Sequence, residues 1–288
     1  MKKRITGMVL KDDLETLLND PELEGDYEFL GRVARDFGGY KDLNADSDFS
    51  GLDAVFFFHY PFSRELAEKL SKYEDKIPFI NKPSGVLKTS EKTFEYEELK
   101  DFAPATKLLE QGVSYEDISG FAENFDSVVV KPVDGTGGKG IYFVDKPYKE
   151  EDVLVLKNLG DEKSGRYIIQ EYLHNNGDHR ILCYNGIVLG GFGRRSDSTR
   201  IHNVSGGGKL TAFKPSKKEI EIAEEVSNRL KGYGVFFSGL DLINDKLVEA
   251  NTAMPGGIDT MTPYRFKSLD DMYKAFVAET RNILGSYK

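Results

Sequence analysis

Hydrophobic positions follow two different periods along this chain. Short apolar runs, typical of strands, alternate with stretches in which apolar residues recur every three or four positions, typical of helices. Residues 53–58 are apolar almost throughout and predict a central parallel strand covered on both faces. An amphipathic helix is expected at 63–73, capped by Ser63, and a further strand at 77–81. This β-α-β order predicts a small N-terminal α/β domain, residues 1–83.

The pattern after residue 83 predicts a larger unit, 84–288, in which strands dominate. Residues 91–126 are polar and expected to be mostly helical. Asn185-Gly186 lies between two alternating runs and is a strong hairpin signal. The strands expected here span residues 127–131, 141–144, 167–170, 180–184 and 187–190.

Helical spacing returns at 217–230 and 269–283, on either side of a strand pair in 239–251. The whole order predicts an α/β protein with α+β subdomains. We expect the larger unit to divide into a small subdomain at about 91–173 and a C-terminal subdomain at about 174–288.

The charge balance excludes some classes of partner. With 39 basic and 48 acidic residues, the net charge of −9 argues against broad binding to nucleic acid or to an anionic membrane. Cys183 is the single cysteine, which excludes an intrachain disulfide, and we expect it in the core. The apolar run after the basic residues 1–4 is too short for a secretory signal, and no run is long enough to span a bilayer. We expect a cytoplasmic protein with no nucleic-acid or membrane partner; the sequence leaves open whether it is a homo-oligomer.

A glycine-rich segment, 131–140, reads Lys-Pro-Val-Asp-Gly-Thr-Gly-Gly-Lys-Gly. Glycines let backbone N–H groups approach phosphate oxygens, and lysine adds charge. A Walker A loop or a dinucleotide fingerprint would lead into a helix, whereas this segment leads into an expected strand. The pattern predicts a flap between antiparallel strands, with Lys131 pointing into a nucleotide site. An exposed hairpin without a ligand is the alternative.

The strand pair 239–251 carries acidic and amide side chains. A three-residue turn at 244–246 would set Asp241 opposite Glu249 and put Asn251 on the same face. Facing carboxylates repel each other, so this pairing indicates a cation between them, and hard oxygen ligands suit Mg²⁺. The alternative is a solvated strand face with scattered charge.

Two more segments carry suitable polar groups. The residues Gln-Glu-Tyr-Leu at 170–173 end a strand, where backbone groups can bind an adenine edge, and Asp178 follows within reach of a ribose. Arginines recur between 193 and 203, next to a glycine run at 206–208. Arginine binds carboxylates and phosphoryl groups with paired hydrogen bonds, so these arginines are candidates for holding a carboxylate and the phosphoryl group transferred to it.

The order of these motifs resembles the ATP-grasp superfamily, and within it the bacterial glutathione synthetase family, from about residue 80 to residue 263. Each motif is modest alone, but six in the same order are specific. The matching segments are Asn81 to Ser84, Lys131 to Gly138, Gln170 to Leu173, Gly177 to Arg180, Thr199-Arg200 with Asn203 and Gly206 to Gly208, and Gly239 to Ile243 with Glu249 to Asn251.

The resemblance implies an ATP-grasp fold with ATP and Mg²⁺ as cofactors. By position, Mg²⁺ would bind Asp241, Glu249 and Asn251, while Arg180 and Arg200 would meet an acyl-phosphate. The residues implied to bind the nucleotide are Lys131, Gly135, Gly137, Gly138, Glu171, Tyr172, Leu173, Asp178 and Asn203. Such enzymes transfer the γ-phosphoryl group of ATP to a carboxylate, and an amine then displaces phosphate to give an amide.

Several positions depart from the family pattern. Met254-Pro255-Gly256-Gly257 replaces the usual Ser-Pro-Thr, and Arg200 lies one residue further from Asn203. Residues 58–61 lack the charges expected for holding γ-glutamylcysteine. A second lysine for the nucleotide is not identified by position, and Lys107 is one candidate. These departures bear on the substrate more than on the nucleotide.

Three functions fit the sequence. The first is a carboxylate-amine ligase of the glutathione synthetase kind, joining γ-glutamylcysteine and glycine. The second is a ligase that adds an amino acid to another peptide or protein carboxylate. The third is a synapsin-like protein that binds ATP without turnover. A complete metal set together with both arginine positions favours a ligase over a pure binding protein.

Overall fold

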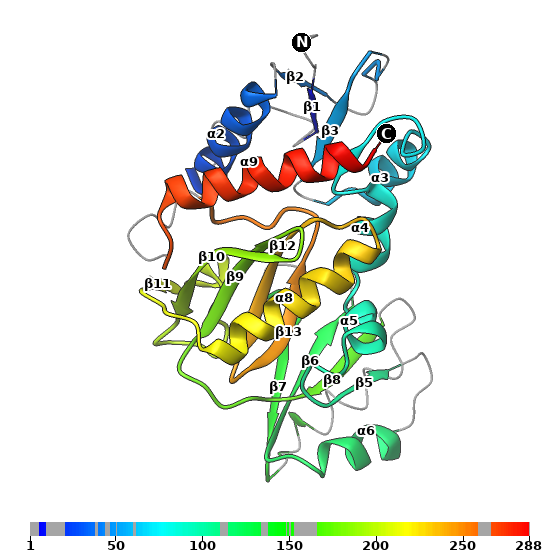
Figure 1. The fold of residues 1–288 in the computed structure, drawn as a ribbon. Coiled ribbons are helices and arrows are strands. Elements are labelled where there is room, and N and C mark those ends of the chain that lie inside the picture. The colour runs from blue at the N-terminus through cyan, green and yellow to red at the C-terminus, as the bar shows by residue number, and fades with distance from the viewer. Residues whose placement is uncertain are drawn as a thin grey trace.

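The computed structural model describes residues 6–9, 21–37, 40–43, 47–49, 51–59, 62–109, 115–133, 138–147, 149, 151–152, 166–258 and 266–287. These residues form three four- or five-stranded sheets with helices packed on them, and they confirm the predicted mixed α/β class. Figure 1 shows the sheets following one another along the molecule, with the sheet of residues 6–80 at one end and the sheet of residues 106–171 at the other.

The N-terminal sheet is parallel. Its strand order is β2 (Tyr40–Asp42), β1 (Thr6–Val9), β3 (Ala54–Phe57) and β4 (Phe79–Ile80). The predicted central strand is β3, fully buried between β1 and β4. The predicted helix is α3 (Arg64–Ser71), where the Ser63 hydroxyl accepts a hydrogen bond from the Leu66 N–H at 3.2 Å. The sequence analysis did not identify β1, β2 or the helix α2 (Pro21–Asp36).

The small sheet is antiparallel, and its strands β6 (Ser127–Pro132) and β7 (Tyr142–Asp145) flank the glycine-rich segment in the sequence. The order of the sheet is β5 (Thr106–Leu109), β8 (Tyr167–Glu171), β6 and β7. The predicted antiparallel pairing of β6 with β7 is confirmed. The mostly helical prediction for 91–126 is right for α5 (Lys92–Glu98) and α6 (Tyr115–Ala122) but wrong for β5. The four residues of β5 show no alternation, and it is pairing with β8 that makes them a strand.

The large sheet is also antiparallel. Its order is β11 (Lys209–Thr211), β10 (Ile187–Arg195), β9 (Asp178–Tyr184), β12 (Phe237–Ile243) and β13 (Lys246–Asn251). The predicted hairpin joins β9 to β10, and its turn residues Asn185 and Gly186 have φ of 53° and 91°, as a type I′ turn requires. The helices α8 (Lys217–Gly232) and α9 (Leu269–Ser286) confirm the two late helical patterns.

Two hydrophobic cores join the N-terminal sheet to the large sheet. Val55 and Phe57 of β3 pack in the first core with α8, whereas Ala54 and Phe56 pack in the second with α2 and α9. Each core also takes residues from one face of the large sheet, and Cys183 lies buried in the first, as predicted. Figure 1 shows α9 crossing where the N-terminal sheet meets the large sheet, and both views show α8 along the large sheet.

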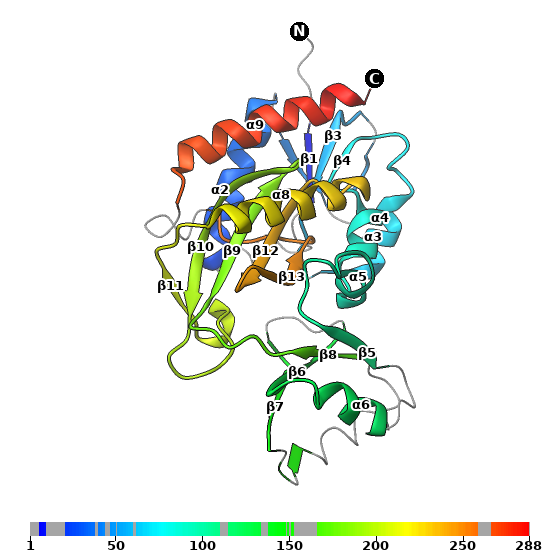
Figure 2. The same cartoon turned by 60° about the horizontal axis from the view of Figure 1, so that its bottom comes forward.

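The small sheet has a core of its own, formed with α6. In Figure 2 it lies at the end of the molecule opposite α9. The predicted boundary at residue 83 stays a prediction: α4 (Pro83–Thr89) begins there, yet both larger cores contain residues from each side of it. Among the described residues no helix combines the length and the apolar character needed to cross a membrane.

Candidate active site

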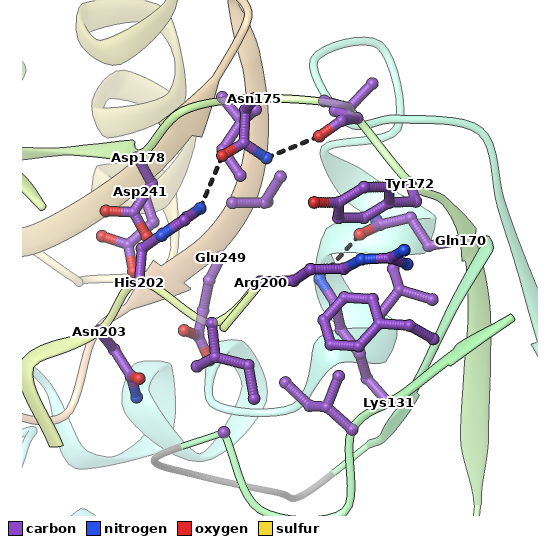
Figure 3. Close-up of a pocket in the computed structure, with 18 of the residues that line it drawn as sticks. Lys131, Gln170, Tyr172, Asn175, Asp178, Arg200, His202, Asn203, Asp241 and Glu249 are labelled. Atoms are coloured by element: carbon purple, nitrogen blue, oxygen red, sulfur yellow. Dashed lines mark hydrogen bonds between the residues drawn. The ribbon is translucent and has the colours of Figure 1, made fainter. Parts of the chain in front are cut away.

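A cavity lies between the small sheet and the large sheet (Figure 3). One wall comes from β6, β7 and β8, and the opposite wall from β9, β10, β12 and β13. The segment 200–203, which follows β10, lines it as well. Most of the predicted site residues line this cavity: Lys131, Gly138, Glu171, Tyr172, Leu173, Asp178, Arg200, Asn203, Asp241 and Glu249. Residues from segments that lie far apart in the sequence therefore share one space.

Asp241 and Glu249 face each other across β12 and β13, as predicted. The turn between these strands is shorter than predicted. It consists of Asn244 and Asp245, with φ of 50° and 58°, which is a two-residue type I′ turn. The register shifts beside Asp241, where Val248 is left as the extra residue of a bulge. The bulge thus preserves the carboxylate pairing that a three-residue turn was expected to produce.

The donor set at this corner fits a hard divalent cation. Asp241 is buried, and the Asn251 amide nitrogen lies 3.4 Å from its Oδ2, on the same side as Glu249. Within the described parts of the chain no cluster of three His, Cys, Asp or Glu residues could hold a metal ion. Two carboxylates and an amide suit Mg²⁺, which typically completes its shell with water and substrate phosphates. That these residues are metal ligands stays a prediction.

Asp241 belongs to a cluster of two arginines and two aspartates. Arg180 donates to both Asp241 oxygens, from Nε and, at 2.9 Å, from Nη2. Arg194 donates to Asp178 at 2.6 and 2.9 Å and also to Asp241 at 2.8 Å. Burial alone would raise the pKa of Asp241, but Arg180 and Arg194 hold it below its usual value. The cluster keeps a buried anion charged at the edge of the cavity.

Arg194 is a site residue that the sequence analysis missed. It is 5% exposed, and although burial opposes it, Asp241 and Asp178 raise its pKa further. The region 193–203 was predicted to supply arginines, but nothing in the sequence distinguished Arg194 from Arg195. Strand alternation makes that distinction, because Arg194 points into the cavity and Arg195 is exposed.

Three lysines line the same cavity: Lys92, Lys131 and Lys139. The Lys131 ammonium donates to the Gln170 side-chain oxygen at 2.8 Å, and Lys92, at the start of α5, lies 3.4 Å from Glu249. Burial lowers the pKa of Lys131. Lys107, the earlier candidate for a second lysine, instead donates to the Asp117 carbonyl on α6 at 3.2 Å, outside the cavity lining. Lys92 therefore lines the cavity, whereas Lys107 does not.

Glu95 is a buried carboxyl whose charge interacts with Lys92 and Lys131. The sequence analysis did not identify it. It accepts a hydrogen bond from the Ala250 N–H at 2.5 Å, between Glu249 and Asn251. Burial, helped by the negative charge of Glu249, raises its pKa to about 7. Glu95 thereby ties α5 to the strand that carries two of the predicted metal ligands.

Residues 171–177, from the last residue of β8 to the start of β9, connect the small sheet to the large sheet, and we call this segment the hinge. The Glu171 N–H donates to the Ala105 carbonyl at 2.8 Å, and the Tyr172 N–H to the Ser127 carbonyl at 3.0 Å. These bonds hold the hinge against the small sheet, with Glu171 to Leu173 lining the cavity. Their predicted contact with adenine stays a prediction. The Asp178 carboxylate, predicted to hold ribose, is bonded at both oxygens to Arg194.

Arg200 lies in the cavity but apart from Arg180. Its guanidinium donates to both Asp145 oxygens, at 2.8 and 2.6 Å, and lies over the rings of Phe143 and Tyr172 at 5.4 and 5.1 Å. In this structure it therefore joins the segment after β10 to the small sheet. Its predicted contact with an acyl-phosphate stays a prediction. Two predicted glycines of the flap, Gly135 and Gly137, lie outside the described residues.

Comparison with known proteins links the chain to glutathione synthetases. The chain is 30% identical over 209 residues to the glutathione synthetase of Agrobacterium fabrum, a match that covers 72% of this chain and 63% of that protein. It is 27% identical over 241 residues to that of Brucella melitensis, covering 82% and 73%. The matches to the first relatives span less than two thirds of their length, 63% and 60% for two of them.

Solved structures show the same fold. D-cycloserine synthetase DcsG superimposes with a TM-score of 0.69 at 13% identity, covering 94% of this chain and 99% of that one. The D-alanine–D-alanine ligase of Bacillus anthracis, solved in complex with ATP, superimposes with a TM-score of 0.66 at 10% identity, covering 100% of both. The predicted ATP-grasp fold is confirmed.

The family model described as prokaryotic glutathione synthetase, ATP-grasp domain, matches residues 91–265. This range contains the small sheet, the large sheet and every described residue that lines the cavity. Since the match extends over more than half of the chain, the chain belongs to the prokaryotic glutathione synthetase ATP-grasp family.

Proposed function

We propose that this protein is an ATP-dependent carboxylate-amine ligase that forms an amide through an acyl-phosphate. One observation carries the proposal: Asp241 lies opposite Glu249 and beside Arg180 and Arg194, in the cavity that also holds Lys131. A site for transferring a phosphoryl group to a carboxylate needs anionic metal ligands and fixed cations together. Family membership supports the same conclusion.

The residues divide into roles by position. Lys131 and Lys92 would hold the phosphates of ATP, since both are partly buried lysines that line the cavity. Asp241, Glu249 and Asn251 would hold Mg²⁺, which when bound neutralises charge on the phosphates. Arg180 and Arg194 lie next to this corner and would hold the substrate carboxylate. Most of the rate gain would come from positioning and charge stabilisation.

The reaction has two balanced steps. A carboxylate oxygen of the acid attacks the γ-phosphorus of ATP, the bond to the bridging oxygen breaks, and ADP leaves. The neutral amine nitrogen then attacks the acyl carbon, phosphate leaves with the bonding electrons, and the nitrogen loses a proton. The fixed guanidinium groups of Arg180 and Arg194 stabilise negative charge on the oxygens in both steps.

We further propose γ-glutamylcysteine and glycine as the acid and the amine. The names of the relatives support this pair. The departing segment 254–257 lies close to the arginines, because Pro255 and Arg180 both pack against Gly239. The segment is held in place by Asp26 of α2, which accepts from the Gly257 N–H at 2.7 Å and the Ile258 N–H at 2.5 Å. The N-terminal region thus shapes the substrate side of the site.

The test is release of ADP from Mg-ATP with γ-glutamylcysteine and glycine, supplied separately and together, with mass spectrometry of the products. ADP that requires both, together with a glutathione mass, is the expected result. ADP released only with other acids and amines would refute the substrate pair while leaving the ligase in place. Nucleotide binding without turnover on any pair would favour the non-catalytic alternative.

Glu249→Gln tests the ligand set. We expect it to lower ADP formation by at least about a hundredfold, because an amide is a far weaker ligand for Mg²⁺ than a carboxylate. Glu221→Gln on the exposed face of α8 is the matched control and should leave turnover unchanged. Equal turnover in both variants would remove Glu249 from the metal site.

A further inference from the structure

His202 is a buried histidine on the segment 196–208, which joins β10 to β11. It is 6% exposed and lines the cavity beside Ile201 and Asn203. This segment is the one that departs from the family spacing, with one residue more between Arg200 and Asn203. A buried imidazole in such a segment needs partners for both ring nitrogens.

Both ring nitrogens of His202 have a partner. The Ser196 N–H donates to Nδ1 at 3.0 Å, so Nδ1 is an acceptor and the ring proton belongs on Nε2. Nε2 lies 2.8 Å from the Asn175 Oδ1 and donates to it. Burial lowers the pKa of His202, which favours this neutral form. The imidazole therefore links the segment 196–208 to Asn175.

Asn175 belongs to the hinge. Its Nδ2 donates to the Leu173 carbonyl at 2.6 Å, and its Oδ1 also accepts from the Gly177 N–H at 2.9 Å. Figure 3 shows the Asn175 side chain bonded on one side to His202 and on the other to the hinge that carries Tyr172. A continuous run of hydrogen bonds thus leads from the backbone of Leu173 to the backbone of Ser196.

The segment 196–208 also contacts the small sheet, through a weaker interaction. Arg200 and Asp145 form an ion pair, but their side chains are 37% and 46% exposed. Exposed pairs contribute only about 0–1 kcal/mol because water screens them. His202 is 6% exposed, so its hydrogen bonds are better shielded from water than this ion pair and are the firmer link.

We propose that His202 and Asn175 are positioning residues that couple nucleotide binding at the hinge to the placement of the segment 196–208. The inference rests on the proposed function, since the hinge must bind a nucleotide. A nucleotide that orders Leu173 would order Asn175 and, through His202, the segment that carries Arg200 and Asn203. The extra residue in this segment would then be what supplies the histidine.

Two substitutions separate the coupling from local structure. His202→Asn places an acceptor near the position of Nδ1 and keeps the bond from Ser196, but the shorter side chain does not reach Asn175. His202→Gln places an amide donor near the position of Nε2 and keeps the bond to Asn175. The first variant therefore cuts the link, and the second retains it.

The experiment combines nucleotide binding with limited trypsin digestion, with and without the non-hydrolysable analogue of ATP and Mg²⁺. Trypsin can cut within or beside the segment after Arg195, Arg200 and Lys209, and mass spectrometry identifies each cut. Neither readout needs the acid or the amine. In the wild type the analogue should slow these cuts by about fivefold or more, the factor expected for one buried hydrogen bond.

In His202→Asn the analogue should bind within about threefold of the wild type, yet protection should be lost, whereas His202→Gln should retain it. Turnover of His202→Asn should show a lower kcat with KM for ATP little changed. Full protection in His202→Asn would overturn this inference but not the proposed function. An equal loss of analogue binding and of protection in His202→Asn would also overturn this inference alone. If His202→Asn did not fold, loss of protection in His202→Gln would overturn it. A wild type that binds no nucleotide would overturn the proposed function as well.

Discussion

The guanidinium of Arg194 bonds to two carboxylates at once and sets the charge balance of the site. Asp178 and Asp241 are both buried, and burial raises the pKa of Asp178 in spite of Arg194. Without a cation between them these two anions would repel each other in a medium that screens charge poorly. Arg194 therefore contributes to stability as well as to the proposed chemistry.

Arg194→Met is expected to lower the free energy of unfolding by about 3–5 kcal/mol, because it leaves buried carboxylates with one partner fewer. Urea unfolding at pH 7 measures the change. Arg195→Met is the matched control: its side chain is exposed and forms an ion pair with the exposed Asp197, so a change within about 0.5 kcal/mol is expected. Equal losses in the two variants would contradict the assignment.

His202 gives the stability a pH dependence. Burial lowers its pKa in the folded protein, with Arg194 and Arg195 acting in the same direction and Asp178 opposing them. Between the lowered pKa and about 6.5, the unfolded chain binds more protons than the folded one. The stability that neutral His202 contributes is thus complete above about pH 6.5 and is lost as the pH falls through the pKa of His202 in the folded protein.

The measurement is urea unfolding of the wild type and His202→Asn between pH 5 and pH 8, a range around the usual histidine pKa of about 6.5. The difference in unfolding free energy should be constant above that pKa and shrink below it. A difference that does not vary with pH would show that His202 does not titrate differently in the two states.

At the scale of elements, the β12–β13 hairpin shows what local pattern can predict. The alternation around Asp241 and Glu249 predicted their pairing, because side chains on one strand face repeat every two residues. The turn length was wrong, since a bulge at Val248 shifts the register by one residue, and bulges have weak sequence signals. The strand β5 was missed because its partner β8 lies far along the chain.

Two helix glycines are expected to change the stability in opposite directions when they are replaced by alanine. A Cβ at Gly85 in α4 would lie 2.1 Å from the Tyr233 carbonyl oxygen, so Gly85→Ala should destabilise the protein by about 1–3 kcal/mol. A Cβ at Gly120 in α6 meets nothing within 4 Å, so Gly120→Ala should stabilise its helix by roughly 0.5–1 kcal/mol. Thermal and urea unfolding would compare the two. A stabilising Gly85→Ala would contradict the close packing of α4.

At the scale of the whole molecule, Asn81 ties the N-terminal sheet to the large sheet. Its side chain is fully buried and donates to the Phe237 and Thr252 carbonyls at 2.7 and 2.9 Å. Its oxygen accepts from the N–H groups of Phe236 and Phe237 at 2.8 and 2.7 Å. With the two shared cores, these bonds should make both sheets unfold together.

Asn81→Ala should lower the free energy of unfolding by at least about 2 kcal/mol, because it strands several buried backbone groups. Asn124→Ala is the control, since that side chain is exposed and bonds to nearby carbonyls at the end of its own helix. We expect urea unfolding to change by no more than about 0.5 kcal/mol there. A small effect at Asn81 would argue that the two sheets are held by their cores alone.

The sequence by itself determined the class of fold, the main strands and helices, and the motifs of the family, because periodicity, turn residues and glycine runs are local signals. Only the tertiary structure decided which side chains share the cavity. Lys92 and Arg194 line this cavity, and Glu95 is buried against Ala250. Arg200 bonds to Asp145, and His202 bonds to Asn175 of the hinge. These contacts join residues far apart in the chain, and in most cases separate strands or helices. Their geometry depends on sheet pairing and burial, which no local pattern encodes.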